Sequence, residues 1–305
     1  MVSLITELRC NRFEDIIGND SIKYILQEII KDPVNKPHNI IFAGSHGNNK
    51  TTFARLLAKA LNNYNEDVSE YLIEVDSSKV SKVEDMRSLL PYISLPTNKH
   101  YKVVIFDEAH LISKIAFSSL LKLIEENTRN LFFIFCTTDI GKMLDTIKSR
   151  SITLYVEDLT REYTEQYLKG LPDKYFNKKY IEDTSLIDLM YMQSKGHFRD
   201  LIQQIELLNV QGSEMYKSTI PNYKDLYYSI IEGNKDSKQR ILNLPLILIE
   251  DSWDFFVKTY DIPLDVITTH LQYRDKLHTT SDWFLFFNLL GKKDSKSIGV
   301  SKIRR

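Results

Sequence analysis

A short polar loop between an apolar segment and an alanine- and leucine-rich segment constrains this fold more than any other feature of the sequence. The apolar segment 39–43 reads Asn-Ile-Ile-Phe-Ala and predicts a buried strand. The loop 44–51 reads Gly-Ser-His-Gly-Asn-Asn-Lys-Thr, and residues 51–61 predict a helix. A glycine-containing loop that leads from a strand into a helix presents backbone N–H groups to a bound phosphate. The sequence therefore predicts an α/β fold with a nucleotide phosphate site at the start of this helix.

Most residues of the loop are expected to contact nucleotide. Lys50 is expected to reach the β- and γ-phosphates of ATP, and Thr51 to hold Mg²⁺. The pattern G-x-x-x-x-G-K-[ST] has glycine where Asn49 stands. Asn tolerates a positive φ better than other non-glycine residues, so Asn49 can preserve the loop; a degenerate loop that no longer binds nucleotide is the alternative. The candidate contacts are Gly44, Ser45, His46, Gly47, Asn48, Asn49, Lys50, Thr51 and Thr52.

A second apolar segment, residues 102–106, ends in the acidic pair Asp107 and Glu108. Asp107 follows Lys50 by 57 residues, and another apolar segment, 71–75, lies between them. This spacing favours an ATPase site, in which Asp107 binds Mg²⁺ and Glu108 orients and deprotonates the attacking water. The alternative is that the two acids only cap the next helix.

Strand and helix patterns alternate through the first half of the chain. Further strands are predicted at 131–136 and 152–156, and the apolar stripe within 117–126 predicts a helix. Such alternation indicates a parallel sheet covered on both faces. The remainder is predicted to be short helices at 159–208, a linker at 209–221, a further helical block at 222–290 and a basic tail at 291–305.

Composition narrows the class of protein further. The net charge of −1 gives no overall field that attracts nucleic acid, so any DNA contact has to come from a local basic patch. Cys10 and Cys136 match no zinc spacing and give no disulfide framework, which fits a reducing cytoplasm. The sequence has no apolar run of about 18 residues, so no membrane partner is expected.

Short motifs in a fixed order resemble those of AAA+ sliding-clamp loader ATPase subunits. Over residues 1–208 the chain is most similar to the bacterial clamp-loader ATPase and to the small subunits of replication factor C. The resemblance implies a RecA-like AAA+ P-loop domain with a parallel sheet, a helical lid domain and an all-helical collar. The matching segments are 12–19, 44–51, 76–87, 107–110, 136–139, 149–151 and 196–200.

The same resemblance implies an activity, cofactors and partners. The expected activity is ATP hydrolysis, stimulated by DNA and clamp, that opens a sliding clamp and loads it onto primer-template DNA during replication. ATP and Mg²⁺ are the expected cofactors, and other clamp-loader subunits, in a pentameric homo- or hetero-oligomer, are expected partners. The expected location is the cytoplasm, which is the host cytoplasm for a phage-encoded chain. The implied domains are 1–158 for the ATPase, 159–210 for the lid, 222–290 for the oligomerising collar and 291–305 for the tail.

The resemblance also implies roles for individual residues. Arg150 would project into a neighbouring subunit's ATP site, and Arg199 would contact the γ-phosphate within its own chain. Thr137 would sense the γ-phosphate or orient the water, with Thr138 as the other candidate. Ile17 belongs to the segment that resembles the family's adenine contact. The candidate DNA contacts are Lys79, Lys82 and Arg87.

Each assignment has a plainer structural alternative. Arg150 is also compatible with an ordinary surface arginine, Arg199 with a partner on its own helix, and Thr137 with a strand end. The DNA candidates are equally compatible with solvated charges. His46 and His110 invite a metal site, but no further residues stand at metal-ligand spacing. Helical spacing favours a packed core over base stacking for Trp253, Phe255, Phe256, Trp283, Phe284, Phe286 and Phe287.

Some features depart from the family pattern. Ser151 replaces the usual cysteine, Cys10-Asn11 stands where a Lys/Arg-Pro pair is often found, and the bacterial four-cysteine zinc module is missing around 62–72. These departures favour a compact subunit of viral, archaeal or eukaryotic type, with a phage origin preferred. Two other functions stay open: a catalytically inactive AAA+ scaffold, favoured by Asn49, and another AAA+ DNA-remodelling motor, for which residues 222–290 offer no DNA-recognition pattern.

Overall fold

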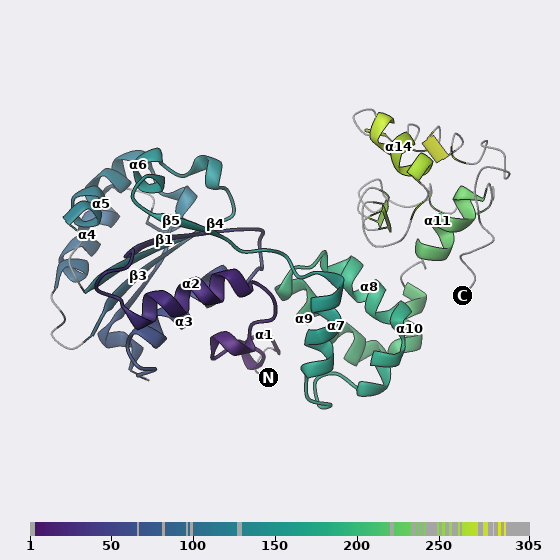
Figure 1. Ribbon diagram of the computed structural model, residues 1–305, viewed down its shortest axis with the longest axis horizontal. Helices are drawn as coiled ribbons and strands as arrows, with labels where there is room; N and C mark the ends of the chain where they lie inside the picture. The colour runs from purple at the N-terminus through teal and green to yellow at the C-terminus, as the bar shows by residue number, and fades with distance from the viewer. Residues whose placement is uncertain are drawn as a thin grey trace. The chain divides into compact units, whose positions relative to one another are not determined.

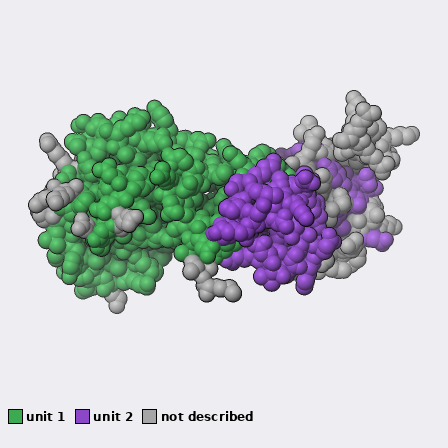
Figure 2. Space-filling model, turned by 90° about the horizontal axis from the view of Figure 1, so that it is seen from below, with its two compact units in different colours: residues 1–167, 196–203 green, residues 168–195, 204–305 purple. Residues whose placement is uncertain are grey.

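The computed structural model describes residues 4–65, 67–80, 83–95, 97, 100–126, 130–219, 223–232 and 264–273, together with shorter stretches and single positions between 236 and 290. The chain forms two compact units, which Figure 2 distinguishes by colour. The first comprises residues 1–167 and 196–203, and the second comprises residues 168–195 and 204–305.

Parallel strands form one sheet in the first unit (Figure 1). The five strands lie in the spatial order β2-β3-β4-β1-β5. The register pairs Asp76 with Asp107 and Ala43 with Thr137, so the carboxyl ends of four strands meet at one edge of the sheet. Every predicted strand is present within one residue of its expected bounds, which confirms the predicted parallel sheet. The strands are β1 (Asn39–Ala43), β2 (Leu72–Asp76), β3 (Lys102–Asp107), β4 (Leu131–Thr137) and β5 (Ile152–Tyr155).

Helices cover both faces of this sheet, because successive residues of each strand point to opposite sides. In β4, Phe132 and Ile134 belong to one hydrophobic core, whereas Phe133 and Phe135 belong to the other. The first core is completed by helices α2 (Asp20–Lys31) and α3 (Lys50–Leu61). The second is completed by α4 (Val83–Ser94) and α5 (Lys114–Glu126) (Figure 1). The first unit is therefore a three-layer α/β/α sandwich.

A short connection, which contains η2 (Val68–Glu70), joins α3 to β2. Asn62 closes this connection: its Nδ2 donates to the carbonyl oxygens of Ala58 and Tyr101, both at 2.9 Å. Its Oδ1 accepts from the backbone N–H of Tyr101 at 2.8 Å. The smaller elements of this unit are α1 (Leu4–Glu7), η1 (Phe13–Asp15), η2 (Val68–Glu70), η3 (Ala109–Leu111), η4 (Ile140–Lys142) and α6 (Asp145–Lys148).

Both cysteines of the chain are free thiols buried in the first unit. Cys136 lies in β4 and is fully buried, and Cys10 is 8% exposed, with its Sγ donating to the carbonyl oxygen of Asp15. Burial raises the pKa of both thiols, that of Cys10 to about 11.

Helices follow the sheet in sequence. They are α7 (Arg161–Gly170), η5 (Lys178–Glu182), α8 (Thr184–Ser194), α9 (Phe198–Gln211), α10 (Ser213–Thr219), α11 (Tyr223–Ile231) and α14 (Leu264–Tyr273). In the part of the chain that the structure describes, none of the helices combines the length and apolar character needed to cross a membrane.

Helix α10 corrects the expectation that residues 209–221 form a linker. The segment is polar in sequence, yet Tyr216 is fully buried and its hydroxyl donates to Oε1 of Gln204 at 2.9 Å. An ion pair between Lys217 of α10 and Asp183, the residue that precedes α8, also fixes the position of α10. One buried aromatic residue and one ion pair hold this helix, and neither produces a periodic apolar pattern.

An aromatic cluster forms a core in the second unit. The ring centroid of Trp253 lies 5.0 Å from that of Tyr227 and 5.3 Å from that of Phe286, both in edge-to-face arrangements. The predicted aromatic residues that the structure describes are buried, as expected for a packed core. Phe255, Phe284 and the basic tail 291–305 lie outside the described residues. The buried members are Trp253, Phe256, Trp283, Phe286 and Phe287.

Candidate nucleotide site

The phosphate loop, residues 44–51, begins directly after β1 and ends in the first turn of α3. The backbone N–H of Gly44 donates to the carbonyl oxygen of Thr137 at 3.2 Å. A Cβ at Gly44 would lie 2.4 Å from the carbonyl oxygen of Val156, so this position has no room for a side chain. Gly47 has a φ of 78°, a conformation that favours glycine. The loop is thus held close to the ends of β4 and β5 by its glycines.

Asn49 adopts the left-handed conformation that the sequence led us to expect. Its φ is 55° and its ψ is 11°, and it is the residue that precedes the first turn of α3. Its carbonyl oxygen accepts the first helical hydrogen bond, from the N–H of Phe53 at 2.8 Å. Asparagine therefore supplies the backbone geometry that the usual glycine supplies at this position.

Lys50 is 6% exposed, and its ammonium group is directed back over the loop. Nζ donates to the carbonyl oxygens of Gly44 and Ser45, at 3.0 and 2.7 Å. Burial lowers the pKa of Lys50, and the nearby carboxylate of Glu108 acts in the opposite direction. The loop carbonyls position this cation where phosphate oxygens would offer it a stronger, charged partner.

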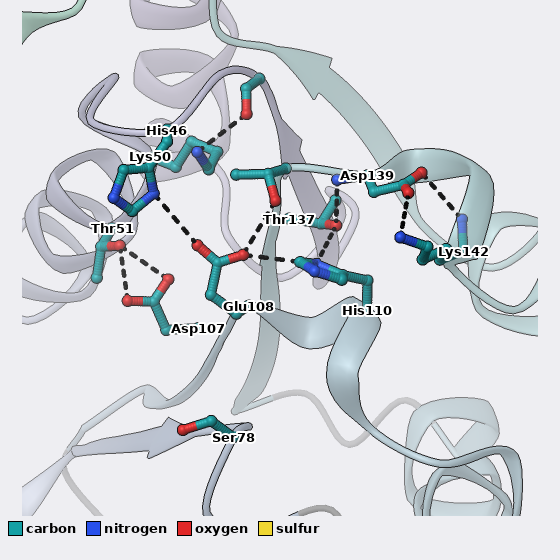
Figure 3. Close-up of polar contacts among 12 residues, drawn as sticks. His46, Lys50, Thr51, Ser78, Asp107, Glu108, His110, Thr137, Asp139 and Lys142 are labelled. Atoms are coloured by element: carbon teal, nitrogen blue, oxygen red, sulfur yellow. Dashed lines mark hydrogen bonds and ion pairs between the residues drawn. The ribbon is translucent and has the colours of Figure 1, made fainter.

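Thr51 and Asp107 meet although they come from α3 and β3. The hydroxyl of Thr51 donates to the carboxylate of Asp107, with 3.1 Å from Oγ1 to each carboxylate oxygen (Figure 3). Hydroxyl and carboxylate oxygens are the ligands that Mg²⁺ prefers, and a site of this kind leaves further positions for water and phosphate. The donor set at this point therefore fits the metal of a Mg²⁺–nucleotide complex.

Glu108 follows Asp107 in a left-handed backbone conformation, with φ 51° and ψ 46°. Its Oε2 accepts from the hydroxyl of Thr138 at 3.2 Å and lies 3.5 Å from Nδ1 of His110. Its Oε1 faces Nδ1 of His46 at 3.9 Å, so His46, Glu108 and His110 form a row across the site (Figure 3). The structure thus holds this carboxylate from two sides.

The two threonines at the end of β4 have different partners. Thr137 is fully buried, and its Oγ1 lies 3.1 Å from Nδ1 of His110 and accepts from the N–H of Asp139 at 3.0 Å. Thr138 is the threonine whose hydroxyl contacts Glu108. Thr137 is connected to the carboxylate through His110, whose Nδ1 lies near both side chains.

Arg199, at the start of α9, docks on the phosphate loop. Its backbone N–H donates to the carbonyl oxygen of Gly47 at 3.2 Å, and a Cβ at Gly47 would lie 3.1 Å from Cβ of Arg199. Its Nη1 lies 3.0 Å from Nε2 of His46. The segment 196–203 is part of the first unit, so these contacts lie within one compact body.

A polar pocket of about 350 Å³ opens above these groups. The candidate residues that line it are His46, Gly47, Asn48, Asn49, Lys50, Thr51, Thr52, Asp107, Glu108 and Arg199. Several candidates do not belong to its lining, among them Ile17, Gly44, Ser45 and Thr137.

Six lining residues were missed by the reasoning from sequence. Asp76 had a usable signal, since it ends β2 as Asp107 ends β3, in register with it. Arg55 also had one, because it lies one helical turn after Thr51 on α3. Phe198 had a signal too, because it lies next to Arg199 within the matching segment 196–200. The other three carry no local signal, because they reach the pocket through tertiary packing: Ile5, Arg9 and Ile202.

Cationic side chains gather at this pocket. Arg55 makes a bidentate contact with Glu74, with both nitrogen–oxygen distances at 2.6 Å. Burial lowers the pKa of Arg9, and the positive charges of Arg55 and Arg199 lower it further. The lining thus places cations that can bind phosphate beside the carboxylates Asp76, Asp107 and Glu108, a combination that fits a phosphate bound together with a cation.

Arg150 lies on the surface, outside the lining of this pocket. Its Nη1 donates to the carbonyl oxygen of Thr146 at 3.1 Å and to Oγ of Ser149 at 3.3 Å. Its Nη2 pairs with Oε1 of Glu125 at 2.8 Å, and both side chains of this pair are substantially exposed.

The candidate DNA contacts are only partly described. Lys79 is exposed and pairs with Asp76 at 3.1 Å, and Arg87 is exposed on α4. Lys82 lies outside the described residues. A role of these three residues in DNA contact therefore stays a prediction.

Comparison with known proteins identifies relatives in bacterial DNA replication. The family model described as DNA polymerase III, delta subunit, matches residues 66–160. The DNA polymerase III subunit gamma of Buchnera aphidicola subsp. Baizongia pistaciae is 30% identical over 266 residues, covering 78% of this chain and 70% of that protein. The corresponding subunit of Buchnera aphidicola subsp. Acyrthosiphon pisum is 31% identical over 268 residues, covering 79% of this chain and 73% of that protein.

The longer relatives extend well beyond this chain. The gamma/tau subunit of Mycoplasma pneumoniae is 34% identical over 223 residues, which are 66% of this chain but 32% of that protein. This chain thus spans about a third of the length of that relative. These relatives are bacterial, so they lend no support to a viral, archaeal or eukaryotic type, and a phage origin stays a prediction.

Solved structures confirm the fold class. The Thermotoga maritima RuvB Holliday junction branch migration motor matches with a TM-score of 0.53 at 19% identity, covering 81% of this chain and 85% of that one. At this identity the likeness concerns the fold alone. It agrees with the expected RecA-like AAA+ arrangement of parallel sheet and helices.

Proposed function

Because this chain belongs to the family of DNA polymerase III gamma subunits, we propose that it is an ATP-hydrolysing subunit of a sliding-clamp loader. Its activity would be to open a ring-shaped clamp and load it onto primer-template DNA during replication. The observation that carries this proposal is the meeting of Lys50, Thr51 and the pair Asp107–Glu108 at one edge of the sheet. These residues are a phosphate-binding cation, two oxygen ligands and a carboxylate that can activate water.

The chain's own residues divide the binding of ATP between them. The N–H groups of the phosphate loop and Lys50 bind the phosphates, and Arg199 contacts the γ-phosphate. Thr51 and Asp107 would hold Mg²⁺, which would neutralise charge on the phosphates. The bulky side chains of Ile5 and Ile202 at the pocket support a nucleoside site there. Ile17 is a weaker candidate for the adenine contact, because it is not part of the pocket lining.

Glu108 is the proposed base for hydrolysis. Its carboxylate accepts a proton from the attacking water as that water adds to the γ-phosphorus and ADP leaves. Thr138 orients the carboxylate by its direct hydrogen bond, and Thr137 would act on it through His110. Thr137 therefore stays a candidate sensor, now in an indirect role.

Assembly completes the proposed site. Arg150 is exposed and does not line the pocket of its own chain, which supports a role in the site of a neighbouring subunit. Other clamp-loader subunits, in a pentameric assembly, and the sliding clamp are the proposed partners. The proposed divisions are an ATPase domain at 1–158, a lid at 159–210, a collar at 222–290 and a tail at 291–305.

DNA contact and location extend the same proposal. Lys79, Lys82 and Arg87 would contact primer-template phosphates, a contact that weakens as salt rises. The work would be done in the cytoplasm, or in the host cytoplasm for a phage-encoded chain.

Steady-state ATP hydrolysis tests the proposal. The assembled protein is measured alone, with primed DNA, and with primed DNA plus the clamp of its replication system, and Lys50→Ala serves as the inactive control. Stimulation by DNA and clamp together is the expected result. If the assembled complex binds no Mg²⁺–ATP in calorimetry, the ATPase is wrong and an inactive scaffold takes its place.

A further inference from the structure

His46 lies between Arg199, which the proposed function assigns to the γ-phosphate, and Glu108, which it assigns to the water that attacks this phosphate. It stands inside the phosphate loop, between Ser45 and Gly47, and lines the pocket. On one side its Nε2 lies 3.0 Å from Nη1 of Arg199. On the other its Nδ1 faces Oε1 of Glu108 at 3.9 Å (Figure 3). The imidazole is therefore the side chain between Arg199 and the carboxylate.

The partners of His46 determine its hydrogen-bonding state in this structure. A guanidinium group has donors and no acceptor, so Nε2 has to accept from Arg199. An imidazole that accepts at Nε2 carries its hydrogen on Nδ1, which is the nitrogen that faces the carboxylate of Glu108. His46 thus satisfies a donor of Arg199 with a neutral acceptor and turns its own donor toward Glu108.

An anion such as a phosphate oxygen can replace His46 as the acceptor for the guanidinium of Arg199. The side chain of His46 is 69% exposed, so breaking its contact with Arg199 leaves no buried group without a partner. A phosphate oxygen carries negative charge, and charge-assisted hydrogen bonds to arginine are stronger than bonds to a neutral acceptor. The backbone bond from Arg199 to Gly47 does not involve the imidazole, so a change of partner by the guanidinium does not require that bond to break.

We propose that His46 is a positioning residue that occupies the guanidinium of Arg199 until the γ-phosphate of ATP displaces it. This inference rests on the proposed function, because it assigns Arg199 to the γ-phosphate. His46 competes with ATP for Arg199 but not with ADP, which lacks the third phosphate. The residue therefore weakens the binding of ATP selectively, and it keeps Arg199 beside the loop in the nucleotide-free chain.

Nucleotide affinities of the full chain test this proposal. Dissociation constants for ATP and ADP are measured by calorimetry with Mg²⁺, in a Glu108→Gln background that slows hydrolysis by about 10²- to 10³-fold. His46→Ala removes the competing acceptor and should tighten ATP binding by about three- to tenfold, where tenfold corresponds to about 1.4 kcal/mol. The affinity for ADP should change by less than about twofold, since Arg199 makes no contact with its phosphates.

Two further variants separate this role from a structural one. His46→Gln is the matched control, because its Oε1 can accept from Arg199 as Nε2 of histidine does, and it should restore ATP affinity toward that of the unaltered chain. In an Arg199→Ala background, His46→Ala should have no effect on ATP affinity, since the two residues act as one unit.

The outcomes are distinguishable. If the unaltered chain binds ATP and His46→Ala leaves its affinity unchanged, or shifts ATP and ADP equally, the proposal is wrong while the ATPase stands. If His46→Ala still tightens ATP binding after Arg199 has been removed, the effect does not pass through Arg199 and the proposal is again wrong. Failure of the unaltered chain to bind either nucleotide contradicts the proposed function and this inference together.

Discussion

The acidic pair at the end of β3 and the surface arginine Arg150 are held in different ways, although both are candidates for the same reaction. Asp107 ends the otherwise buried strand β3 and Glu108 follows it, and their side chains accept hydrogen bonds from Thr51 in α3 and from Thr138, directly after β4. Arg150 is exposed and pairs with Glu125 across the surface. The hydrophobic core thus fixes the residues proposed to bind Mg²⁺ and to activate water. Arg150, in contrast, lies on the surface, where a neighbouring molecule can reach it.

Removal of Arg150 should have the largest effect on turnover. Arg150→Ala removes charge stabilisation from the neighbour's site and should lower kcat of the assembled complex by about 10³-fold, while each chain still binds ATP. Steady-state hydrolysis and calorimetry measure the two quantities. Glu125→Gln is the matched control: it removes only the exposed partner within the same chain, so activity should stay within about threefold.

A mixture of two inactive variants tests whether Arg150 acts on the ATP site of another chain. Chains that lack Arg150 are combined with chains that lack Lys50, so that some interfaces contain one intact Lys50 site and one intact Arg150. Activity of the mixture should exceed the sum of the two separate variants, provided that energy transfer between labelled chains has shown subunit exchange. A freely exchanging mixture that stays as inactive as its components means that Arg150 does not complete a neighbour's site.

Glu108→Gln tests the proposed role of the acidic pair at the end of β3. The amide keeps the size of the side chain but cannot accept the proton, so hydrolysis should fall by about 10²- to 10³-fold. Binding of ATP should persist, because Lys50 and the loop N–H groups are unchanged, and single-turnover hydrolysis with calorimetry measures both. Hydrolysis at the unaltered rate would show that the acidic pair has been assigned incorrectly.

Asn49→Gly should have the smallest effect. Glycine adopts the observed φ of 55° without the steric cost that asparagine bears, so the loop keeps its geometry. The affinity for Mg²⁺–ATP should be similar or tighter, by no more than about threefold. A loss of ATP binding on this substitution would mean that the asparagine side chain itself contributes to the site.

The sheet and the phosphate loop were predictable because their signals are local. Buried parallel strands produce continuous apolar runs, and the residues that end them, such as Asp107, fall at one edge of the sheet by topology alone. Asn49 was predictable for a similar reason, since its left-handed conformation depends on its own backbone and its immediate neighbours.

The parts that sequence reasoning missed depend on packing between distant segments. Nothing near Ile5 or Arg9 indicates that the chain's first residues line the pocket. The choice between Thr137 and Thr138 depends on how the chain bends directly after β4, where Thr138 turns its hydroxyl to Glu108 while Thr137 stays buried beside His110. Helix α10 went unpredicted because a single buried tyrosine, Tyr216, anchors it.

The burial of both native cysteines has a practical consequence for labelling. The thiolate is the reactive form of cysteine, and raised pKa values together with burial keep Cys10 and Cys136 protonated and shielded at neutral pH. Neither should be modified readily by a maleimide reagent in the folded chain. A cysteine introduced at a highly exposed position, such as Val210 at 85% exposure, would then be the reactive thiol of the molecule. Fluorophores for the subunit-exchange measurement can therefore be attached at one chosen position while the native cysteines stay in place.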